Sequence, residues 1–200
     1  MLNTLLLKDG LFDKLLEFDR WLFIKINSEW SNSFFDSIFP FWRHSDTWLP
    51  LYLFLFLFMV MNFGWKSIPW MLMLGLTAGI CDQISSSFIK EFVGRIRPCR
   101  EESLMGIVDF RILYCPQSGS FTSSHATNHF GVAMFIYLTM KDVFKKAGLW
   151  FFVWAATICY GQVYVGVHYP FDVIGGAILG CVIGYLMAFL FKKQPILAYK

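Results

Sequence analysis

The sequence predicts an all-α protein, a polytopic membrane bundle with about five transmembrane helices behind an N-terminal amphipathic segment. Of its 200 residues, 56% are hydrophobic and 16% are charged, and the mean hydropathy is +0.53. Soluble domains carry roughly 25% charged residues, so this chain has too few to cover a water-facing surface. Several uncharged stretches also approach the roughly 20 apolar residues that cross a bilayer. The net charge of +3 is small and dispersed, which argues against a nucleic-acid partner.

Residues 1–46 are expected to lie on the membrane rather than to cross it. Apolar and charged residues interleave there, a spacing that suits an amphipathic helix in the interface, with Trp21 and Trp30 at headgroup depth. The first residues lack the basic start and cleavage site of a signal peptide, so we expect them to be retained. The segment is interpreted as a lateral brace for the bundle, with a substrate gate as the alternative.

Residues 47–200 are expected to form the transmembrane domain, and five apolar stretches within them predict membrane-spanning helices. The predicted spans are residues 47–63, 67–89, 125–140, 147–164 and 173–191.

Two of these spans carry further information. The second holds Asp82 and a run of three serines near its end; polar groups at that depth are costly unless they face a protein interior or a wet cavity, so they indicate a site. In the fifth, Gly176, Gly180 and Gly184 recur every four residues. Small residues at this spacing let helices approach closely, which predicts a packing face.

Three polar clusters lie between Lys90 and Asp172, at residues 90–98, 120–125 and 161–172. With five spans, all three fall on one membrane face. The opposite face collects lysines in short segments, with Asp142 as the only acidic residue there. By the positive-inside rule that face and the C-terminus are cytoplasmic. The clusters are therefore expected on the periplasmic or extracellular side of the cell inner membrane.

The first cluster gathers four cations, Lys90, Arg95, Arg97 and Arg100. Such cations at a helix end can simply snorkel to the interface. They can equally clamp an anion, because an Arg fork matches phosphate oxygens and Lys supplies a point charge. This cluster by itself favours neither interpretation.

The second cluster places serines and a threonine before His125, at the expected start of a helix. Ordinary capping explains serines there, but a helix N-terminus also offers free amides and a positive dipole end to a phosphate. His125 and His129 are one turn apart without the adjacent Glu of a zinc protease.

The third cluster holds His168 and Asp172, four residues apart. A lone histidine at an interface commonly makes only hydrogen bonds. A carboxylate that holds one imidazole nitrogen instead fixes the ring as a nucleophile or base. Together with His125 from another span, the chain then has one histidine to attack phosphorus and one to protonate the leaving oxygen.

Cys99 and Cys115 bracket the long loop on the outer face. In an oxidising compartment a bridge between them would add about 3 kcal/mol by the chain-entropy estimate; two unpaired thiols are the alternative. No second Cys or His pair stands beside them at ligand spacing, so a zinc site is not expected.

The three clusters together resemble the signature of the type 2 phosphatidic acid phosphatase superfamily, bacterial branch, which comprises membrane lipid phosphatases related to vanadium haloperoxidases. The first motif (Lys, six residues, Arg-Pro) is matched in full from Lys90 to Pro98. The second (Pro-Ser-Gly-His) is matched at Ser123 and His125. The third (Ser-Arg, five residues, His, three residues, Asp) keeps its His and Asp, with Gly161 and Gln162 at the first two positions.

The resemblance implies that His168 forms a phosphohistidine, that Asp172 orients it and that His125 is the general acid. It implies no metal and no cofactor. The residues implied to bind the phosphate oxygens are Lys90, Arg97, Ser123, the amide of Ser124 and, where Arg is usual, Gln162. An amide can donate a hydrogen bond but brings no charge. Gln162 therefore either weakens transition-state binding or is offset by Arg95 or Arg100, and the sequence does not decide between the two.

The predicted function is metal-independent hydrolysis of a phosphate ester or diphosphate of an envelope lipid, and the expected partner is that lipid phosphate. Candidate substrates are undecaprenyl diphosphate, phosphatidylglycerophosphate, phosphatidate and a lipid A phosphate, with a slight preference for the first. The alternative is a catalytically weak lipid-phosphate-binding protein that lost turnover through Gln162. A channel or transporter fits less well, because the polar residues gather at one face instead of lining a path.

Overall fold

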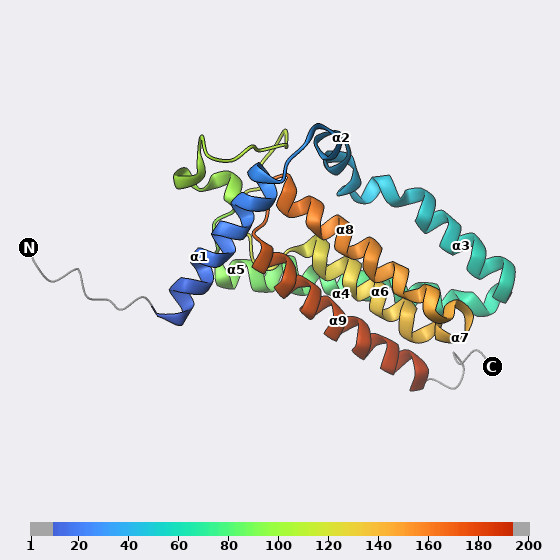
Figure 1. Ribbon diagram of the computed structural model, residues 1–200. Coiled ribbons are helices and arrows are strands. Elements are labelled where there is room, and N and C mark those ends of the chain that lie inside the picture. The colour runs from blue at the N-terminus through green and yellow to red at the C-terminus, as the bar shows by residue number, and fades with distance from the viewer. Residues whose placement is uncertain (1–9, 194–200) are drawn as a thin grey trace, which may run out of the picture.

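The structure, a computed structural model, describes residues 10–193, and this part of the chain is helical with no strand (Figure 1). The helices are α1 (Leu11–Ile24), α2 (Ser33–Trp42), α3 (Leu49–Phe63), α4 (Ile68–Gln83), α5 (Lys90–Val93), α6 (Ser124–Thr139), α7 (Lys141–Phe144), α8 (Trp150–Tyr164) and α9 (Pro170–Lys193). The predicted all-α class is confirmed.

Each predicted span contains one long helix, namely α3, α4, α6, α8 and α9 in chain order. Within the described residues, two helical stretches are long and apolar enough to cross a membrane by length and composition, Ser45–Val93 and Pro170–Lys193. The chain changes direction within the first of these at Gly64, whose φ of +56° favours glycine. As a result α3 and α4 are two separate helices that run in different directions (Figure 1).

The N-terminal segment contains two helices, α1 and α2, joined through a π-helical turn at Lys25–Glu29. Asn27 in this turn is fully buried and donates to the carbonyl oxygens of Asp109 and Tyr164, each at 2.8 Å. The segment is therefore tied to the long loop and to the end of α8. Trp21 and Trp30 are about half exposed. The first nine residues of the expected amphipathic segment, and Lys200, lie outside the described residues.

Helix α6 is at the centre of the bundle, packed against α4, α8 and most extensively α9. The glycine repeat of α9 makes this contact possible. A Cβ atom would lie 2.6 Å from the carbonyl oxygen of Ser123 at Gly176, and 2.3 Å from a backbone oxygen of α6 at both Gly180 and Gly184. The predicted packing role of these glycines is confirmed.

Replacing Gly180 with alanine should destabilise the bundle, because the new Cβ would meet the carbonyl oxygen of Thr127. Overpacking of this kind costs about 1–3 kcal/mol, so the midpoint of thermal unfolding in detergent should fall. Gly79→Ala in α4 is the matched control, since no atom lies within 4 Å of its added Cβ. Equal midpoints for the two variants would contradict this packing argument.

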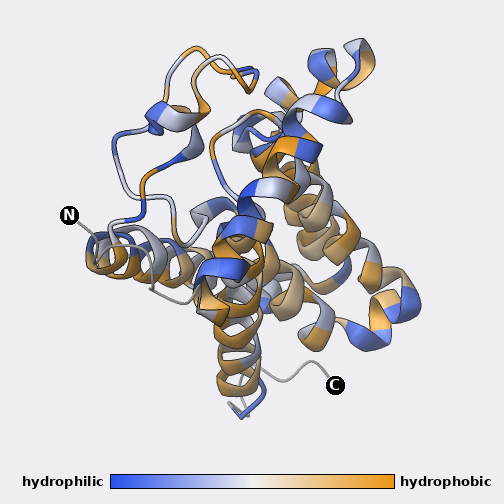
Figure 2. Cartoon of the chain, turned by 60° about the vertical axis from the view of Figure 1, so that its left-hand side comes forward, coloured by the Kyte–Doolittle hydropathy of each residue, from blue (hydrophilic) through white to orange (hydrophobic). Residues whose placement is uncertain are grey.

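The outward faces of the long helices are apolar, as lipid contact requires. On α9 the exposed apolar residues recur about every four positions. They are Ile174, Ile178, Val182, Leu186 and Leu190, with Tyr185 and Phe189 beside the last two. Figure 2 shows apolar colours along these helices and hydrophilic colours concentrated in the connecting segments. The loop after α5, the start of α6 and the start of α9 share one end of the bundle, and α7 lies at the other (Figure 1).

Candidate active site

The three polar clusters of the sequence meet at that first end of the bundle. Arg97 of the first cluster lies 3.0 Å from His168 of the third, measured from Nη1 to Nε2. Lys90 of the first cluster donates to the Ser124 hydroxyl of the second at 2.5 Å. The fold therefore assembles one site from segments that are far apart in the sequence.

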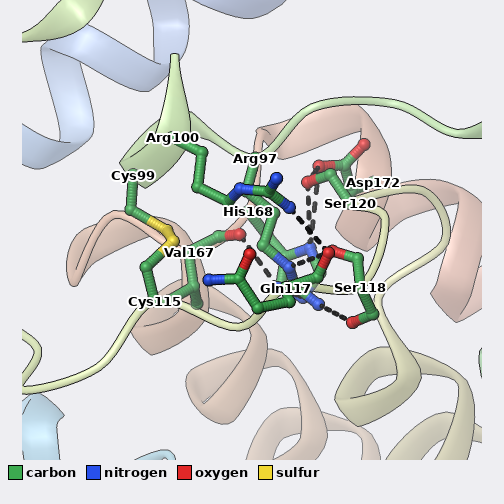
Figure 3. The surroundings of a disulfide bond; sticks show 10 residues. All are labelled: Arg97, Cys99, Arg100, Cys115, Gln117, Ser118, Ser120, Val167, His168 and Asp172. Carbon is green, nitrogen blue, oxygen red and sulfur yellow. Dashed lines mark hydrogen bonds and ion pairs between the residues drawn. A yellow bond between two sulfur atoms is a disulfide. The ribbon is translucent and has the colours of Figure 1, made fainter. Parts of the chain in front are cut away.

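His168 lies in the connection between α8 and α9 and is 2% exposed. Its Nε2 accepts the hydrogen bond from Arg97, while its Nδ1 faces the Asp172 carboxylate, 3.6 Å from Oδ2 (Figure 3). An acceptor at Nε2 puts the ring proton on Nδ1, beside the carboxylate. Nε2 therefore carries the lone pair that a nucleophile needs.

Asp172, in the first turn of α9, is fully buried and every contact holds its carboxylate in place. Oδ2 accepts from the Ser120 hydroxyl at 2.5 Å and from the Tyr169 amide at 2.8 Å. Oδ1 accepts from Arg95 Nη1 at 2.7 Å. Such a carboxylate keeps His168 in one orientation and one tautomer.

Arg97 is 4% exposed and its guanidinium is fixed by the loop around it. Nε donates to the Ser118 carbonyl at 2.9 Å, and Nη2 donates to the Ser118 hydroxyl at 3.1 Å. The disulfide between Cys99 and Cys115 lies immediately beyond, with Cα atoms 6.0 Å apart (Figure 3). The bond ties together the two ends of the loop that carry Arg97 and Ser118.

The polar run at the end of the second predicted span faces this site. The hydroxyls of Ser85 and Ser86 lie 3.2 and 2.8 Å from that of Ser124, and Ser86 also donates to Asp82 at 3.0 Å. Together with Lys90 they surround the Ser124 side chain at the first residue of α6. This placement agrees with the prediction that Asp82 and the serine run face a site.

Ser123 is the N-cap of α6 and fully buried. Its hydroxyl accepts from the Ala126 amide at 3.5 Å, and its own amide donates to the Asp172 carbonyl oxygen at 3.0 Å. Its side chain therefore caps the helix, and the amide of Ser124 is the group at this N-terminus that suits a phosphate oxygen.

His125 lines a cavity of about 600 Å³ between α3, α4, α6 and α8. The His129 ring, one turn further along α6, donates from Nδ1 to the His125 carbonyl oxygen at 2.7 Å. His125 directly follows Ser124, whose hydroxyl accepts from Lys90, and both residues line this cavity. The second histidine is therefore placed beside the site.

The cavity has both polar and apolar lining. Its polar lining includes Ser45, Asp82, Ser124, His125, Asn128 and His129. Its apolar lining includes Leu55, Phe56, Trp70, Met71, Leu74 and Val132. A molecule that carries both a phosphate ester and an acyl chain needs polar and apolar lining of this kind.

The side chain of Gln162 makes no hydrogen bond to Arg95 or Arg100, the two arginines that the sequence offered as one way to offset its missing charge. Arg95 is bound between Asp172 and Asp19, and Arg100 donates to the Gln117 carbonyl oxygen at 2.6 Å. The residue that meets Gln162 is Arg43, at the end of α2, whose Nη1 donates to Gln162 Oε1 at 3.0 Å.

Sequence reasoning missed three residues of this neighbourhood. Asp19 of α1 is fully buried and accepts from Arg95 Nη2 at 2.6 Å and from the Phe171 amide at 2.8 Å. Arg43 holds Gln162, and Ser120 donates to Asp172. Of these three, only Ser120 could have been suspected from the sequence, because it falls within the second polar cluster.

Burial sets the electrostatics of the groups in the loops. It lowers the pKa of His168 from 6.5 to about 4, against the opposing effect of Asp172 and with the help of the Arg97 charge. Burial also lowers the pKa of Arg97, to about 10. At neutral pH the site therefore holds a neutral imidazole beside a cationic guanidinium. Within residues 10–193 no group of three or more His, Cys, Asp or Glu side chains is placed to hold a metal ion.

Comparison with known proteins gives consistent matches. The sequence model of the PAP2 superfamily matches residues 66–195. A lipid A 4'-phosphatase of Bacteroides thetaiotaomicron is 34% identical over 174 residues, covering 80% of this chain and 75% of that protein. A lipid A 4'-phosphatase of Porphyromonas gingivalis is 28% identical over 174 residues, covering 86% and 72%.

Two solved structures share the fold. A transmembrane PAP2-type phosphatidylglycerolphosphate phosphatase from Bacillus subtilis has a TM-score of 0.66 at 22% identity, covering 92% of this chain and 89% of its own. LpxE from Aquifex aeolicus has a TM-score of 0.59 at 25% identity, covering 84% and 93%.

Proposed function

The chain belongs to the PAP2 superfamily and is a membrane lipid phosphatase, and from this premise we propose that it removes the 4'-phosphate of lipid A. The two similar lipid A 4'-phosphatases support this substrate, and the comparisons give no support to the preference for undecaprenyl diphosphate. Because the chain is a phosphatase, the alternative of a protein that only binds lipid phosphates is also not favoured.

The observation that carries the mechanism is the fixed His168 imidazole, with Nε2 toward Arg97 and Nδ1 toward Asp172. In the first step Nε2 attacks phosphorus, and the bond from phosphorus to the sugar oxygen breaks. His125 gives a proton to that leaving oxygen. The product is a phosphohistidine at His168, with Asp172 stabilising the charge on the ring.

In the second step water attacks the phosphohistidine, and His125 takes its proton. The bond from phosphorus to Nε2 breaks, phosphate leaves, and His168 regains its lone pair. In both steps charge develops on the nonbridging oxygens, which Lys90, Arg97 and the Ser124 amide are close enough to stabilise. Arg97 would move its Nη1 from Nε2 to a phosphate oxygen as substrate binds.

The surroundings of the site support a lipid substrate. The cavity of about 600 Å³ that His125 lines is bounded mainly by apolar side chains. A phosphate can then sit between Lys90 and Arg97 while an acyl chain of the same molecule lies between α3 and α4. Lipid A carries both groups on one sugar.

For the orientation, we propose that the site faces the periplasm and that the C-terminus is cytoplasmic, in the inner membrane. The described residues at the end of the bundle opposite the site include Lys66, Lys141, Lys145, Lys146, Lys192 and Lys193. This excess of lysine supports a cytoplasmic side. The disulfide at the site end supports an oxidising compartment.

The substrate is tested by incubating the purified protein with bisphosphorylated lipid A in detergent containing EDTA. We expect loss of the 4'-phosphate alone, read by mass spectrometry of the isolated lipid. Phosphatidate, phosphatidylglycerophosphate and undecaprenyl diphosphate are assayed beside it. Faster hydrolysis of any of these, or loss of the 1-phosphate first, would overturn the substrate proposal without affecting the phosphatase assignment.

The pH dependence of the first step should reflect the buried histidine. Because His168 attacks in its neutral form and has a pKa of about 4 instead of 6.5, its rate of phosphoenzyme formation should hold as the pH falls from 7 and decline only near 4. The substrate for this measurement is an aryl phosphate, whose leaving group needs little protonation by His125. Single-turnover rates across this range, with the fold monitored by circular dichroism, check the prediction. A half-maximal rate near 6.5 would contradict it.

A further inference from the structure

Gln162 and Arg43 form a pair that uses both ends of the glutamine amide. Gln162 is 1% exposed in the last turn of α8. Its Oε1 accepts from Arg43 Nη1 at 3.0 Å, and its Nε2 donates to the Arg43 carbonyl oxygen at 3.4 Å. Gln162 is therefore engaged in holding Arg43 rather than in reaching toward the phosphate site itself.

Gly161 makes room for the same contact. A Cβ at this position would lie 3.1 Å from Phe39 Cδ1 and 3.5 Å from Arg43 Cβ. A larger side chain there would push α2 away from α8. Gly161 and Gln162, the two departures from the expected motif, thus both serve the docking of Arg43.

The Arg43 guanidinium is charged, partly buried and incompletely paired. Its Nε is buried without a hydrogen-bond partner, and among residues 10–193 no carboxylate forms an ion pair with it. Burial lowers its pKa. A cation in such a position is costly unless an anion completes its surroundings.

The Arg43 charge is held close to the phosphate site. Gln162, which binds it, accepts through its backbone carbonyl oxygen from the Val167 amide at 3.2 Å, and Arg97 donates from Nη1 to the Val167 carbonyl oxygen at 3.2 Å. Arg43 also interacts electrostatically with His125 and with Arg97. These two residues stand on the leaving-group and nucleophile sides of the proposed reaction. An anion placed between them would lie within reach of Arg43 as well.

We propose that Arg43 binds the substrate phosphate and that Gln162 is the residue that positions it. The guanidinium comes from α2, outside the matched residues 66–195. Asp36 of α2 supports this placement by accepting hydrogen bonds from Tyr164 and Arg111. The inference rests on the proposed phosphoryl transfer at His168.

The test is an exchange of charge between the two positions. Arg43→Gln should lower kcat/KM by about 100- to 1,000-fold, the usual cost of removing one donor to the transition state. Arg43→Lys should lose less, because it keeps the charge. The double variant Arg43→Gln with Gln162→Arg should recover at least about tenfold of the loss, since the guanidinium returns from the α8 side.

Three readouts separate phosphate binding from a structural role. Lys141→Gln, an exposed charge at the far end of the bundle, should leave kcat/KM unchanged. Thermal midpoints should be similar for Arg43→Gln and the double variant. The inhibition constant of orthovanadate should rise with Arg43→Gln and fall again in the double variant. Unchanged turnover and vanadate inhibition in Arg43→Gln, or a double variant no better than the single one, would overturn the proposal.

Failure of the proposed substrate is distinguishable from failure of this inference. If the wild-type protein released no phosphate from lipid A, the proposed function would be wrong. Calorimetric titration with orthovanadate would still compare the wild-type protein with Arg43→Gln. Equal vanadate affinity would then reject a phosphate-binding role for Arg43, and weaker affinity in the variant would support it.

Discussion

His168→Ala is expected to lower lipid phosphate release by about 10,000-fold, because loss of a nucleophile removes the covalent route and leaves only binding and charge stabilisation. Neither of the two nearby histidines is expected to replace it. His125 lines the cavity and has the role of general acid, and the His129 ring donates to the His125 carbonyl oxygen. Phosphate release under saturating lipid measures the effect.

The role of His168 can be separated from that of His125 by the leaving group. The leaving group of an aryl phosphate needs little protonation. The His125→Ala variant, which is slow on the lipid substrate, should therefore hydrolyse an aryl phosphate at a rate much closer to that of the wild-type protein. His168→Ala should not recover, because the attack on phosphorus is still missing. If both variants recovered alike on the aryl phosphate, the assignment of the two roles would be wrong.

Arg95→Ala is expected to have the second large effect, chiefly on stability. One guanidinium lies between two fully buried carboxylates, 2.6 Å from Asp19 and 2.7 Å from Asp172, and stacks over the Tyr169 ring at 4.1 Å. Its removal leaves two buried negative charges facing each other, and breaking a buried pair costs about 3–5 kcal/mol. Denaturation in detergent should show this loss, and turnover should fall because Asp172 loses one anchor.

Matched variants test the cause. Asp19→Asn keeps the pair between Arg95 and Asp172, so its turnover should stay close to that of the wild-type protein. Combining Asp19→Asn with Arg95→Ala removes one of the two stranded charges and should be more stable than Arg95→Ala alone. A double variant as unstable as Arg95→Ala would show that lost packing, and not the stranded carboxylates, explains the effect.

The fold was accessible from the sequence because membrane helices obey a strong constraint. A long uncharged stretch in a bilayer has few alternatives to the helix, because its backbone groups must be hydrogen-bonded within the segment. Each of the five predicted spans coincides with one long helix. The glycine spacing of α9 predicted a close contact, and Gly180 meets the α6 backbone as expected. The internal organisation of the N-terminal segment was not predictable, since the burial of Asn27 depends on a loop and a helix distant in sequence.

Much of the site could also be predicted, because its motifs hold fixed spacings within short segments. Lys90 contacts Ser124 and Arg97 contacts His168, which joins the first cluster to the second and to the third. Asp19 and Arg43 could not be found in this way. Asp19 meets Arg95 across 76 positions and Arg43 meets Gln162 across 119, and single charges in an amphipathic stretch are typical of a solvated face. The substrate could not be predicted from the sequence either. The cavity is lined by residues from four helices, and no fixed spacing along the sequence marks them.

The measurement that tests the central claim most directly is rapid-quench trapping of the phosphoenzyme. Protein mixed with lipid A radiolabelled in its 4'-phosphate is quenched in alkali, digested and mapped by mass spectrometry. We expect an alkali-stable, acid-labile phosphate on His168, formed before free phosphate and absent in His168→Ala. Steady hydrolysis with no label on the protein, or label on a different residue, would contradict it.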